Sequence, residues 1–241
     1  MQINNNTNQI TFSDNRFYVT ESGNYVPSVT TIGDAYPKGA EYFSWLKKVG
    51  EDADTIRDEA GRRGSIVHEL TERYDSGEKI NLIENGGKIG FKLSEWSMFE
   101  RYVDFRKRHE VENKLIEVNM ISEKLGYAGT MDRYAVVNGV PMIIDIKTSG
   151  AIYPFYWLQL AAYKKLMEEK YPKLPVKQVG ILWLNSKTRT EKEFQGIGWQ
   201  LVTKSDVTKE LELFDATHKL WLAENGSLKP KTLTYQLSYQ L

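Results

Sequence analysis

The chain has 241 residues, which is long enough for one large domain with a substantial buried core. Lys and Arg together number 32, as do Asp and Glu, so the zero net charge argues against a sequence-independent DNA coat protein, while leaving room for a local basic groove. The absence of cysteine excludes disulfides, thiolate zinc sites and Cys-ligated iron–sulfur clusters.

The sequence shows none of the patterns that direct a chain into or across a membrane. No apolar run approaches the roughly 18 residues needed to span a bilayer. The first residues carry neither an apolar signal core nor the Arg-rich pattern of a transit peptide. We therefore expect a cytoplasmic protein with no membrane partner.

The first part of the chain is predicted to form a small hairpin followed by helices. Residues 9–26 alternate polar and apolar side chains around turns at Asp14-Asn15 and Ser22-Gly23-Asn24, which is typical of a hairpin. Pro27-Ser28 then opens a mostly helical stretch. The predicted helices cover residues 39–49, 51–75 and 93–110, and a loop at Asn85-Gly86-Gly87 precedes the last of them.

From about residue 114 the apolar residues recur with a period of two, which indicates strands. The predicted strands are 114–123, 128–137, 140–147, 176–184 and a shorter one near 190–202. The predicted helices are 152–170, which Pro172 ends, and 204–224, before a polar tail at 227–241. This order predicts an α/β fold in which helices flank a mixed sheet.

The strongest local signal is Asn138-Gly139 between two apolar runs, because a two-residue type I′ turn needs a positive φ at both positions. If these residues form the loop, the numbers of every facing pair sum to 277, so Asp132 faces Asp145. This pair falls in the non-hydrogen-bonded class, with Cα atoms about 4.5 Å apart. Lys147 lies two residues beyond Asp145, on the same face.

Two facing carboxylates without a charge partner repel each other, and one is pushed towards protonation. A bound divalent cation removes this repulsion, and carboxylate oxygens suit Mg²⁺ or Mn²⁺. The ammonium of Lys147 would then position and activate a water, or stabilise charge that develops on a phosphate. The alternative interpretation is a surface hairpin with an ordinary Asp–Lys pair.

Four short motifs occur in a fixed order along the chain. They are Gly64-Ser65-Ile66-Val67-His68, Gly129-Thr130-Met131-Asp132, Asp145-Ile146-Lys147 and Gln159-Leu160-Ala161-Ala162-Tyr163. In this order they resemble the PD-(D/E)XK nuclease superfamily, in its RecB-like branch, which includes the mitochondrial genome maintenance exonuclease and phage and CRISPR-associated exonucleases. Pro27-Ser28-Val29-Thr30 also resembles an early segment of the mitochondrial-type members, so the resemblance spans about residues 27–184. Met131, in place of the family's Pro, precedes Asp132, which is common in this branch.

The resemblance implies a restriction-endonuclease-like core, with a central mixed sheet flanked by helices and an N-terminal hairpin and helical elaboration. It implies a single nuclease domain over residues 1–241. Within it, residues 61–202 would form the core, residues 1–60 the N-terminal elaboration, and residues 203–241 a C-terminal helix and tail. One or two Mg²⁺ or Mn²⁺ ions are implied. No iron–sulfur cluster is expected, because the cysteines that hold it in some relatives are missing.

The resemblance also implies a set of metal ligands. Asp132 and Asp145 would bind the metal with help from the Ile146 carbonyl, and His68 would reach in from its helix. Glu72 lies four residues after His68 on the same helix face and would fix the tautomer of the ring. The alternative for a lone helical histidine is a packed or solvated side chain.

Other residues would act on the water, the lysine or the DNA. Lys147 would serve the nucleophilic water, and Gln159 and Tyr163 would orient Lys147 or the DNA backbone. Without the resemblance, Gln159 and Tyr163 read as the boundary of an amphipathic helix. The candidate DNA contacts are Arg62, Arg63, Thr148 and Tyr163, and for the two arginines the alternative is surface solvation.

Glu117 is a further candidate for the acidic cluster. If the preceding turn lets Glu123 face Ala128, then Asn119 faces Asp132, and Glu117 points to the same face of the sheet. Glu117 would then complete the cluster. A solvated strand glutamate is the alternative.

Together these features predict a metal-dependent DNA nuclease, in which a metal-activated water attacks a phosphodiester in line. The favoured form is an exonuclease on single-stranded DNA or DNA ends, encoded by a bacterium or phage. The alternatives are a structure-selective endonuclease, a metal hydrolase of another phosphate ester, and a non-catalytic DNA-binding module on the same fold. The last alternative predicts loss of a metal ligand or the lysine, and Asp132, Asp145 and Lys147 are all present.

Overall fold

The computed structural model of the chain describes residues 2–4, 8–12, 15–83, 87–226, 228 and 230. Several expected features therefore lie at least partly outside the described residues. These are the turn at Asp14-Asn15, the loop at Asn85-Gly86-Gly87 and most of the polar tail at 227–241.

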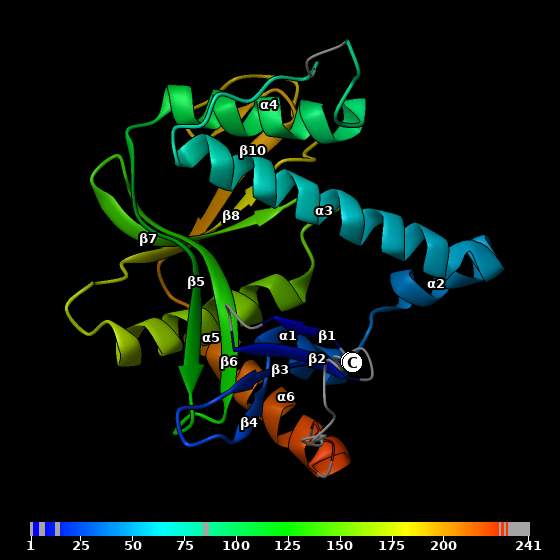
Figure 1. Cartoon of the computed structure of the whole chain (residues 1–241), viewed down its shortest axis with the longest axis vertical. Coiled ribbons are helices and arrows are strands. Elements are labelled where there is room, and N and C mark those ends of the chain that lie inside the picture. Colours follow the sequence, from blue (N-terminus) through cyan, green and yellow to red (C-terminus); the bar gives the residue numbers. More distant parts are fainter. Residues whose placement is uncertain are drawn as a thin grey trace, which may run out of the picture.

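The described residues form two sheets and several helices (Figure 1). The strands are β1 (Gln2–Asn4), β2 (Gln9–Phe12), β3 (Asn15–Val19), β4 (Tyr25–Pro27), β5 (Val111–Ser122), β6 (Tyr127–Val137), β7 (Val140–Lys147), β8 (Gln178–Trp183), β9 (Gln195–Gly196) and β10 (Trp199–Lys204). The helices are α1 (Val29–Ile32), α2 (Ala40–Val49), α3 (Ala53–Asp75), α4 (Leu93–Arg108), α5 (Pro154–Lys170) and α6 (Thr208–Asn225), with short 3₁₀ turns η1 (Gly33–Ala35) and η2 (Gly50–Asp52).

The central sheet has six strands in the order β5-β6-β7-β8-β10-β9. Its neighbouring strands are antiparallel, except that β7 and β8 run parallel and α5 connects them along the chain. A parallel pair needs such a crossover, whereas β6 and β7 are joined by a tight turn. The predicted α/β fold with a mixed sheet flanked by helices is confirmed.

Helices cover both faces of the central sheet. On one face lie α3 and α4, and on the other lie α5, α6 and α1 (Figure 1). Each face has its own apolar core, and the buried residues of β7 alternate between the two: Ile143 belongs to the α5 side, while Ile144 and Ile146 belong to the α3 side. Asp145 therefore interrupts the apolar run of β7, which is buried on both faces of the sheet.

The β6–β7 hairpin has the register that the sequence predicts. Facing pairs run from Val137–Val140 to Arg133–Ile144, so their numbers sum to 277 throughout. The loop residues Asn138 and Gly139 have φ angles of 48° and 80°. These are the left-handed angles that a type I′ turn requires.

The β5–β6 register differs from the prediction by two residues. Ser122 faces Tyr127, and the connecting loop ends at Gly126, which has a φ of 76°. Glycine takes this angle at little cost, whereas Tyr127 is buried and begins β6. Consequently Glu117, between the pairs formed by its neighbours, falls opposite Asp132, so the predicted Asn119–Asp132 pairing is wrong.

The N-terminal strands form a four-stranded antiparallel sheet, which is larger than the predicted hairpin. Its turn at Ser22-Gly23-Asn24 is as predicted, with Gly23 at a φ of 82°. Ser28 then caps α1 by accepting a hydrogen bond from the backbone N–H of Thr31. A parallel bridge between Ser28 and Ala128 joins this segment to the start of β6.

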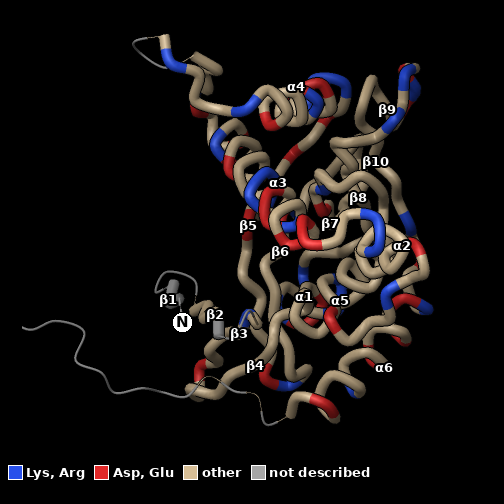
Figure 2. Tube along the Cα trace, turned by 90° about the vertical axis from the view of Figure 1, so that its right-hand side faces the viewer, with Lys and Arg blue, Asp and Glu red and all other residues tan. Residues whose placement is uncertain are grey.

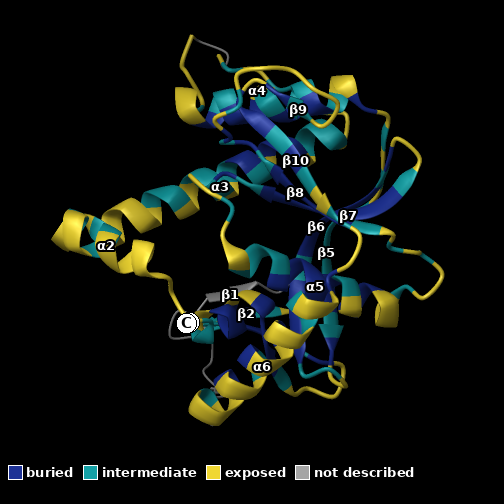
Figure 3. Ribbon diagram, turned by 180° about the vertical axis from the view of Figure 1, so that it is seen from behind, coloured by how far each residue is buried: buried dark blue, intermediate teal, exposed yellow. Residues whose placement is uncertain are grey.

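The α2 helix contains no buried residue and lies apart from the two helical layers (Figure 3). Lys and Arg alternate with Asp and Glu along α3 and α4, so both signs of charge occur on this side of the molecule (Figure 2). Among the described residues, no helix is both long enough and apolar enough to cross a membrane.

Candidate metal centre

Three side chains from three elements converge between α3 and the central sheet. His68 comes from α3, Glu117 from β5 and Asp132 from β6. Their ligand atoms all lie within 4.8 Å of one another. His68 Nδ1 lies 3.6 Å from Glu117 Oε1 and 3.6 Å from Asp132 Oδ2. We call His68, Glu117 and Asp132 the ligand triad.

The second ring nitrogen of His68 is fixed by the sheet, because Nε2 lies 2.9 Å from the carbonyl oxygen of Ile146. Burial lowers the pKa of His68, but the charges of Asp132 and Glu117 outweigh it and raise the pKa to about 9. In the metal-free protein the ring is therefore protonated at neutral pH, and Nε2–H donates to Ile146. A cation at Nδ1 would take the place of the second ring proton.

Glu72 does not serve as the predicted partner of His68. Its side chain is exposed, and both ring nitrogens of His68 face other groups. The spacing of four residues puts Glu72 near His68 on the helix, but His68 points towards the sheet. The groups that contact the ring of His68 come from β5, β6 and β7, and not from Glu72.

Asp132 joins β6 to β7 just beyond the paired part of the hairpin. Its Oδ2 accepts a 2.7 Å hydrogen bond from the backbone N–H of Ile146. The ladder between β6 and β7 ends at the pair Arg133–Ile144, so Asp132 and Asp145 are not part of it as predicted. Asp132 instead contacts the β7 backbone through its side chain. Asp132 is thereby fixed beside the strand that carries Asp145.

The buried Asp145 and the half-buried Lys147 form an ion pair at the carboxyl end of β7. Lys147 Nζ lies 2.7 Å from Asp145 Oδ2, with angles that fall short of a hydrogen bond. Within the described residues, neither oxygen of the Asp145 carboxylate accepts a hydrogen bond, although the residue is only 1% exposed. Burial raises the pKa of Asp145 to about 6 against the opposing charge of Lys147, and the charge of Asp132 adds to the rise.

A chain of contacts from α5 holds Lys147. Its Nζ donates to Gln159 Oε1 at 3.2 Å and lies 4.5 Å from the centre of the Tyr156 ring. Gln159 Nε2 in turn donates to the hydroxyl of Tyr163 at 2.9 Å. Since Tyr163 is buried, we interpret it as a support for Gln159 rather than as a surface for DNA.

The glycine that precedes Asp132 by three residues has a steric explanation. A Cβ at Gly129 would lie 2.5 Å from Tyr163 Cε1, which is closer than two carbon atoms can approach. The Gly129 and Tyr163 positions of the two motifs are therefore packed against each other.

The residues predicted to contact DNA are either paired with a carboxylate or at least partly buried. Arg62 pairs with Glu59 at 3.0 Å and with the buried Glu95 at 2.5 Å, so its charge is already neutralised. Glu95 belongs to α4, 33 residues away, and helix spacing could not reveal it. Arg63 is half-buried. Thr148 is buried, and its Oγ1 would lie 3.4 Å from a Cβ at Gly64 of α3.

Sequence reasoning missed Arg133, which follows Asp132 in β6. Its side chain is 1% exposed and contacts Glu117 Oε1 at 3.2 Å through Nη1. The signal was present: a charged residue between Asp132 and the apolar run of a buried strand needs a buried partner. The sequence could not indicate which carboxylate that partner is.

The donor set fits a hard divalent cation. Two carboxylates and an imidazole within 4.8 Å match the oxygen and nitrogen ligands of Mn²⁺, and carboxylate oxygens also suit Mg²⁺. The buried Asp145 carboxylate lies beside them, paired with Lys147 but without a well-aligned hydrogen bond, so its oxygens have acceptor capacity left for a cation. Such a group is stable when a cation or a proton neutralises it.

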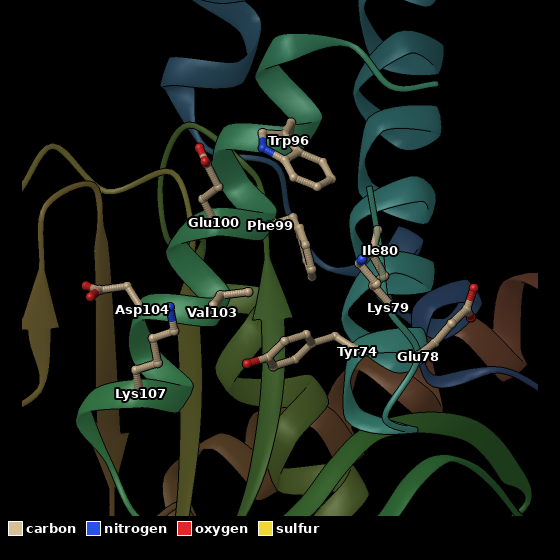
Figure 4. Close-up of a pocket in the computed structure, with 10 residues that line it drawn as sticks. All are labelled: Tyr74, Glu78, Lys79, Ile80, Trp96, Phe99, Glu100, Val103, Asp104 and Lys107. Carbon is tan, nitrogen blue, oxygen red and sulfur yellow. The ribbon is translucent and has the colours of Figure 1, made fainter. Parts of the chain in front are cut away.

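A cavity of about 490 Å³ lies elsewhere, between the end of α3 and α4 (Figure 4). Tyr74, Trp96 and Phe99 are among the side chains that line it (Figure 4). None of the lining residues belongs to the ligand triad or to the Asp145–Lys147 pair. The cavity is therefore separate from the candidate metal centre.

No protein-family model matches this chain, and no curated protein matches it. Among solved structures, the chain is similar to a "putative exonuclease" from Eubacterium rectale, at 15% sequence identity and a TM-score of 0.39. The match covers 74% of this chain and 77% of the other.

Proposed function

We propose that this chain is a metal-dependent nuclease that hydrolyses phosphodiester bonds in DNA. The observation that carries the proposal is the convergence of the ligand triad beside the Asp145–Lys147 ion pair. Carboxylates and a histidine can hold a metal ion that assists phosphate hydrolysis, and a nearby lysine can stabilise the charge that develops on the phosphate. Their order in the sequence, which resembles that of PD-(D/E)XK nucleases, supports the same function and membership of the RecB-like branch.

The chain's own residues would divide the work of the site. His68, Glu117, Asp132 and Asp145 would hold Mg²⁺ or Mn²⁺. A bound ion of this kind lowers the pKa of its water and stabilises charge on a phosphate oxygen. Lys147, held by Asp145 and Gln159, would orient the attacking water and stabilise the negative charge that develops on the phosphate in the transition state.

The finer parts of the proposal follow from the motifs. We infer that residues 1–241 act as one nuclease domain, and that the substrate is DNA with free ends or single-stranded regions. The exposed rings of Tyr42 and Phe43 on α2 and of Tyr153 next to α5 would be available for stacking on unpaired bases. A structure-selective endonuclease is the competing form of the same activity.

The decisive experiment is digestion of end-labelled linear DNA, single-stranded and double-stranded, and of circular single-stranded DNA, with Mg²⁺, Mn²⁺ or EDTA. Metal-dependent release of nucleotides from linear substrates, with the circle intact, would support an exonuclease. Cleavage of the circle would identify an endonuclease. DNA binding without cleavage under any metal would contradict the enzymatic proposal.

Two variants test the roles of Asp145 and Lys147. We expect Asp145→Ala and Lys147→Ala each to lower metal-dependent cleavage at least about a hundredfold, because each removes a group that acts in the transition state. Circular dichroism would show that the variants remain folded. Lys165→Ala, which removes an exposed lysine of α5, is the matched control and should cleave like the wild type. Full activity of either site variant would reject the assignment.

A further inference from the structure

Arg133 contacts more of the candidate centre than its position in β6 predicts. Its guanidinium donates to Asp75 Oδ2 at 2.8 Å, Glu117 Oε1 at 3.2 Å, the backbone carbonyl of Asp132 at 2.7 Å and Thr71 Oγ1 at 3.1 Å. The side chain is almost completely buried. One planar group therefore joins α3, β5 and β6.

The contact with Thr71 extends to the remaining member of the triad. Thr71 Oγ1 donates to the backbone carbonyl of His68 at 2.8 Å. Arg133 is thus bonded directly to Glu117 and to the backbone of Asp132, and through one hydroxyl to the backbone of His68. Each of the three segments that bring a ligand to the centre is fixed by the same side chain.

Charge alone does not explain a buried arginine at this place, because a cation-binding site is disfavoured by a neighbouring positive charge. Asp75, whose side chain is fully buried, and Glu117 both pair with the guanidinium and offset its charge. What remains is geometry: a planar fork with five N–H donors can hold several acceptors at fixed relative positions, and an ammonium cannot.

The backbone of Glu117 has a conformation that needs to be held by neighbouring contacts. Its φ of 49° lies in the left-handed region, which is unfavourable for a residue with a long side chain. A conformation of this kind persists only when surrounding contacts enforce it. The ion pair with Arg133 is one such contact, and it lies at the carboxylate that the triad uses.

We propose that Arg133 is the positioning residue of the metal centre. It sets the relative positions of Glu117, Asp132 and the His68 segment, so that the three can bind one cation. This role rests on the proposed function only in requiring that the triad binds a metal; it does not require that the substrate is DNA.

The test is the affinity for Mn²⁺ alone, measured on the full chain by calorimetry and by the loss of free-Mn²⁺ electron paramagnetic resonance signal. Arg133→Lys keeps the charge but cannot hold the same set of acceptors. We expect its dissociation constant for Mn²⁺ to rise about 10- to 100-fold, as for loss of other groups that orient metal ligands.

Arg106→Lys is the matched control. Arg106 also pairs with Asp75, but it contacts no member of the triad. We expect Arg106→Lys to lower the melting temperature while leaving the dissociation constant for Mn²⁺ unchanged. This separates a loss of stability from a loss of positioning, provided that binding is measured well below both melting temperatures.

Thr71→Val provides a second variant in case Arg133→Lys does not fold. It keeps the volume of the side chain and removes the link between Arg133 and the His68 carbonyl. We expect about a threefold rise in the dissociation constant, as for loss of one ordinary hydrogen bond.

The outcomes are distinguishable. Wild-type Mn²⁺ affinity in folded Arg133→Lys, or in Thr71→Val where the first variant does not fold, would overturn the positioning role and leave the metal centre standing. An equal loss in Arg106→Lys would overturn it as well. A wild-type chain that binds no Mn²⁺ would overturn the metal centre and the positioning role together. Altered Mn²⁺ affinity in a protein that cleaves no DNA would support the positioning role and reject only the nuclease activity.

Discussion

Asp145 places a carboxylate in the interior of the sheet with a lysine as its charge partner. Its raised pKa means that the folded state favours the protonated carboxyl more than the unfolded chain does. Such a group stabilises the fold below its ordinary pKa of 3.8, and this contribution is lost as the pH rises through about 6. The raised pKa of His68 acts in the same direction at higher pH, from 6.5 to about 9.

We therefore expect the metal-free wild type to become less stable between pH 4.5 and 9. The contribution of Asp145 is isolated by comparing the wild type with Asp145→Asn in EDTA, using the free energy of unfolding from urea titrations at pH 4.5 and 7. The wild type should lose on the order of 2 kcal/mol relative to the variant over this interval. If the difference in the free energy of unfolding between the two proteins stayed constant, or changed in the other direction, the pKa of Asp145 would not be raised in the folded state.

At the level of single residues, the sequence identifies the candidate ligands better than their partners. His68, Asp132, Asp145 and Lys147 follow from short motifs, because each motif lies within one helix or strand. The partners come from other elements, as Glu117 does for His68. A helix neighbour such as Glu72 is the only kind of partner that local spacing can suggest, and here it is not the one used.

At the level of elements, local turn chemistry decides how much can be predicted. Asn138-Gly139 allows one short loop, and the register of β6 against β7 follows from it. The β5–β6 loop has four residues, Glu123 to Gly126, and sequence leaves open which residues it contains. The resulting shift of two residues keeps the same side chains on each face, so Glu117 still reaches the centre.

Two glycines with empty surroundings allow the backbone contribution of these elements to be measured. A Cβ at Gly61, in the middle of α3, or at Gly139, in the hairpin loop, would meet no atom within 4 Å. We expect Gly61→Ala to stabilise the protein by about 0.5–1 kcal/mol, because alanine favours the helix. Gly139→Ala should destabilise it by about 1–2 kcal/mol, because of the φ of 80°.

Urea titration of both glycine variants would give the two free energies of unfolding. Gly150→Ala, which has open space and no left-handed φ, is the control and should stay within about 0.5 kcal/mol of the wild type. Effects of the same sign at Gly61 and Gly139 would contradict the assignment of a helix at one and a type I′ turn at the other.

At the level of the whole molecule, the candidate centre lies where two layers meet. His68 belongs to the α3 layer, and Glu117, Asp132 and Asp145 belong to the sheet. The layered arrangement follows from the pattern of the sequence, but the crossing of α3 over these strands does not. It is set by the shared apolar core to which α3 contributes Val67 and the sheet contributes Ile146.

A cation held by both layers should stabilise the whole fold. We expect Mn²⁺ at a hundred times its dissociation constant to add about 2.7 kcal/mol to the free energy of unfolding and to raise the melting temperature. Glu117→Gln, which removes one charged ligand, should show a smaller rise at the same Mn²⁺ concentration. Equal shifts in the two proteins would mean that the ion binds at another site.

The distances along the chain between His68, Glu117 and Asp132 also bear on how the protein is made. A ribosome that has released only the first hundred residues has produced His68 but neither of the carboxylates that β5 and β6 contribute. Such a nascent chain carries one member of the ligand triad. Any cleavage activity would therefore begin only after β5, β6 and β7 have been synthesised and have packed against α3.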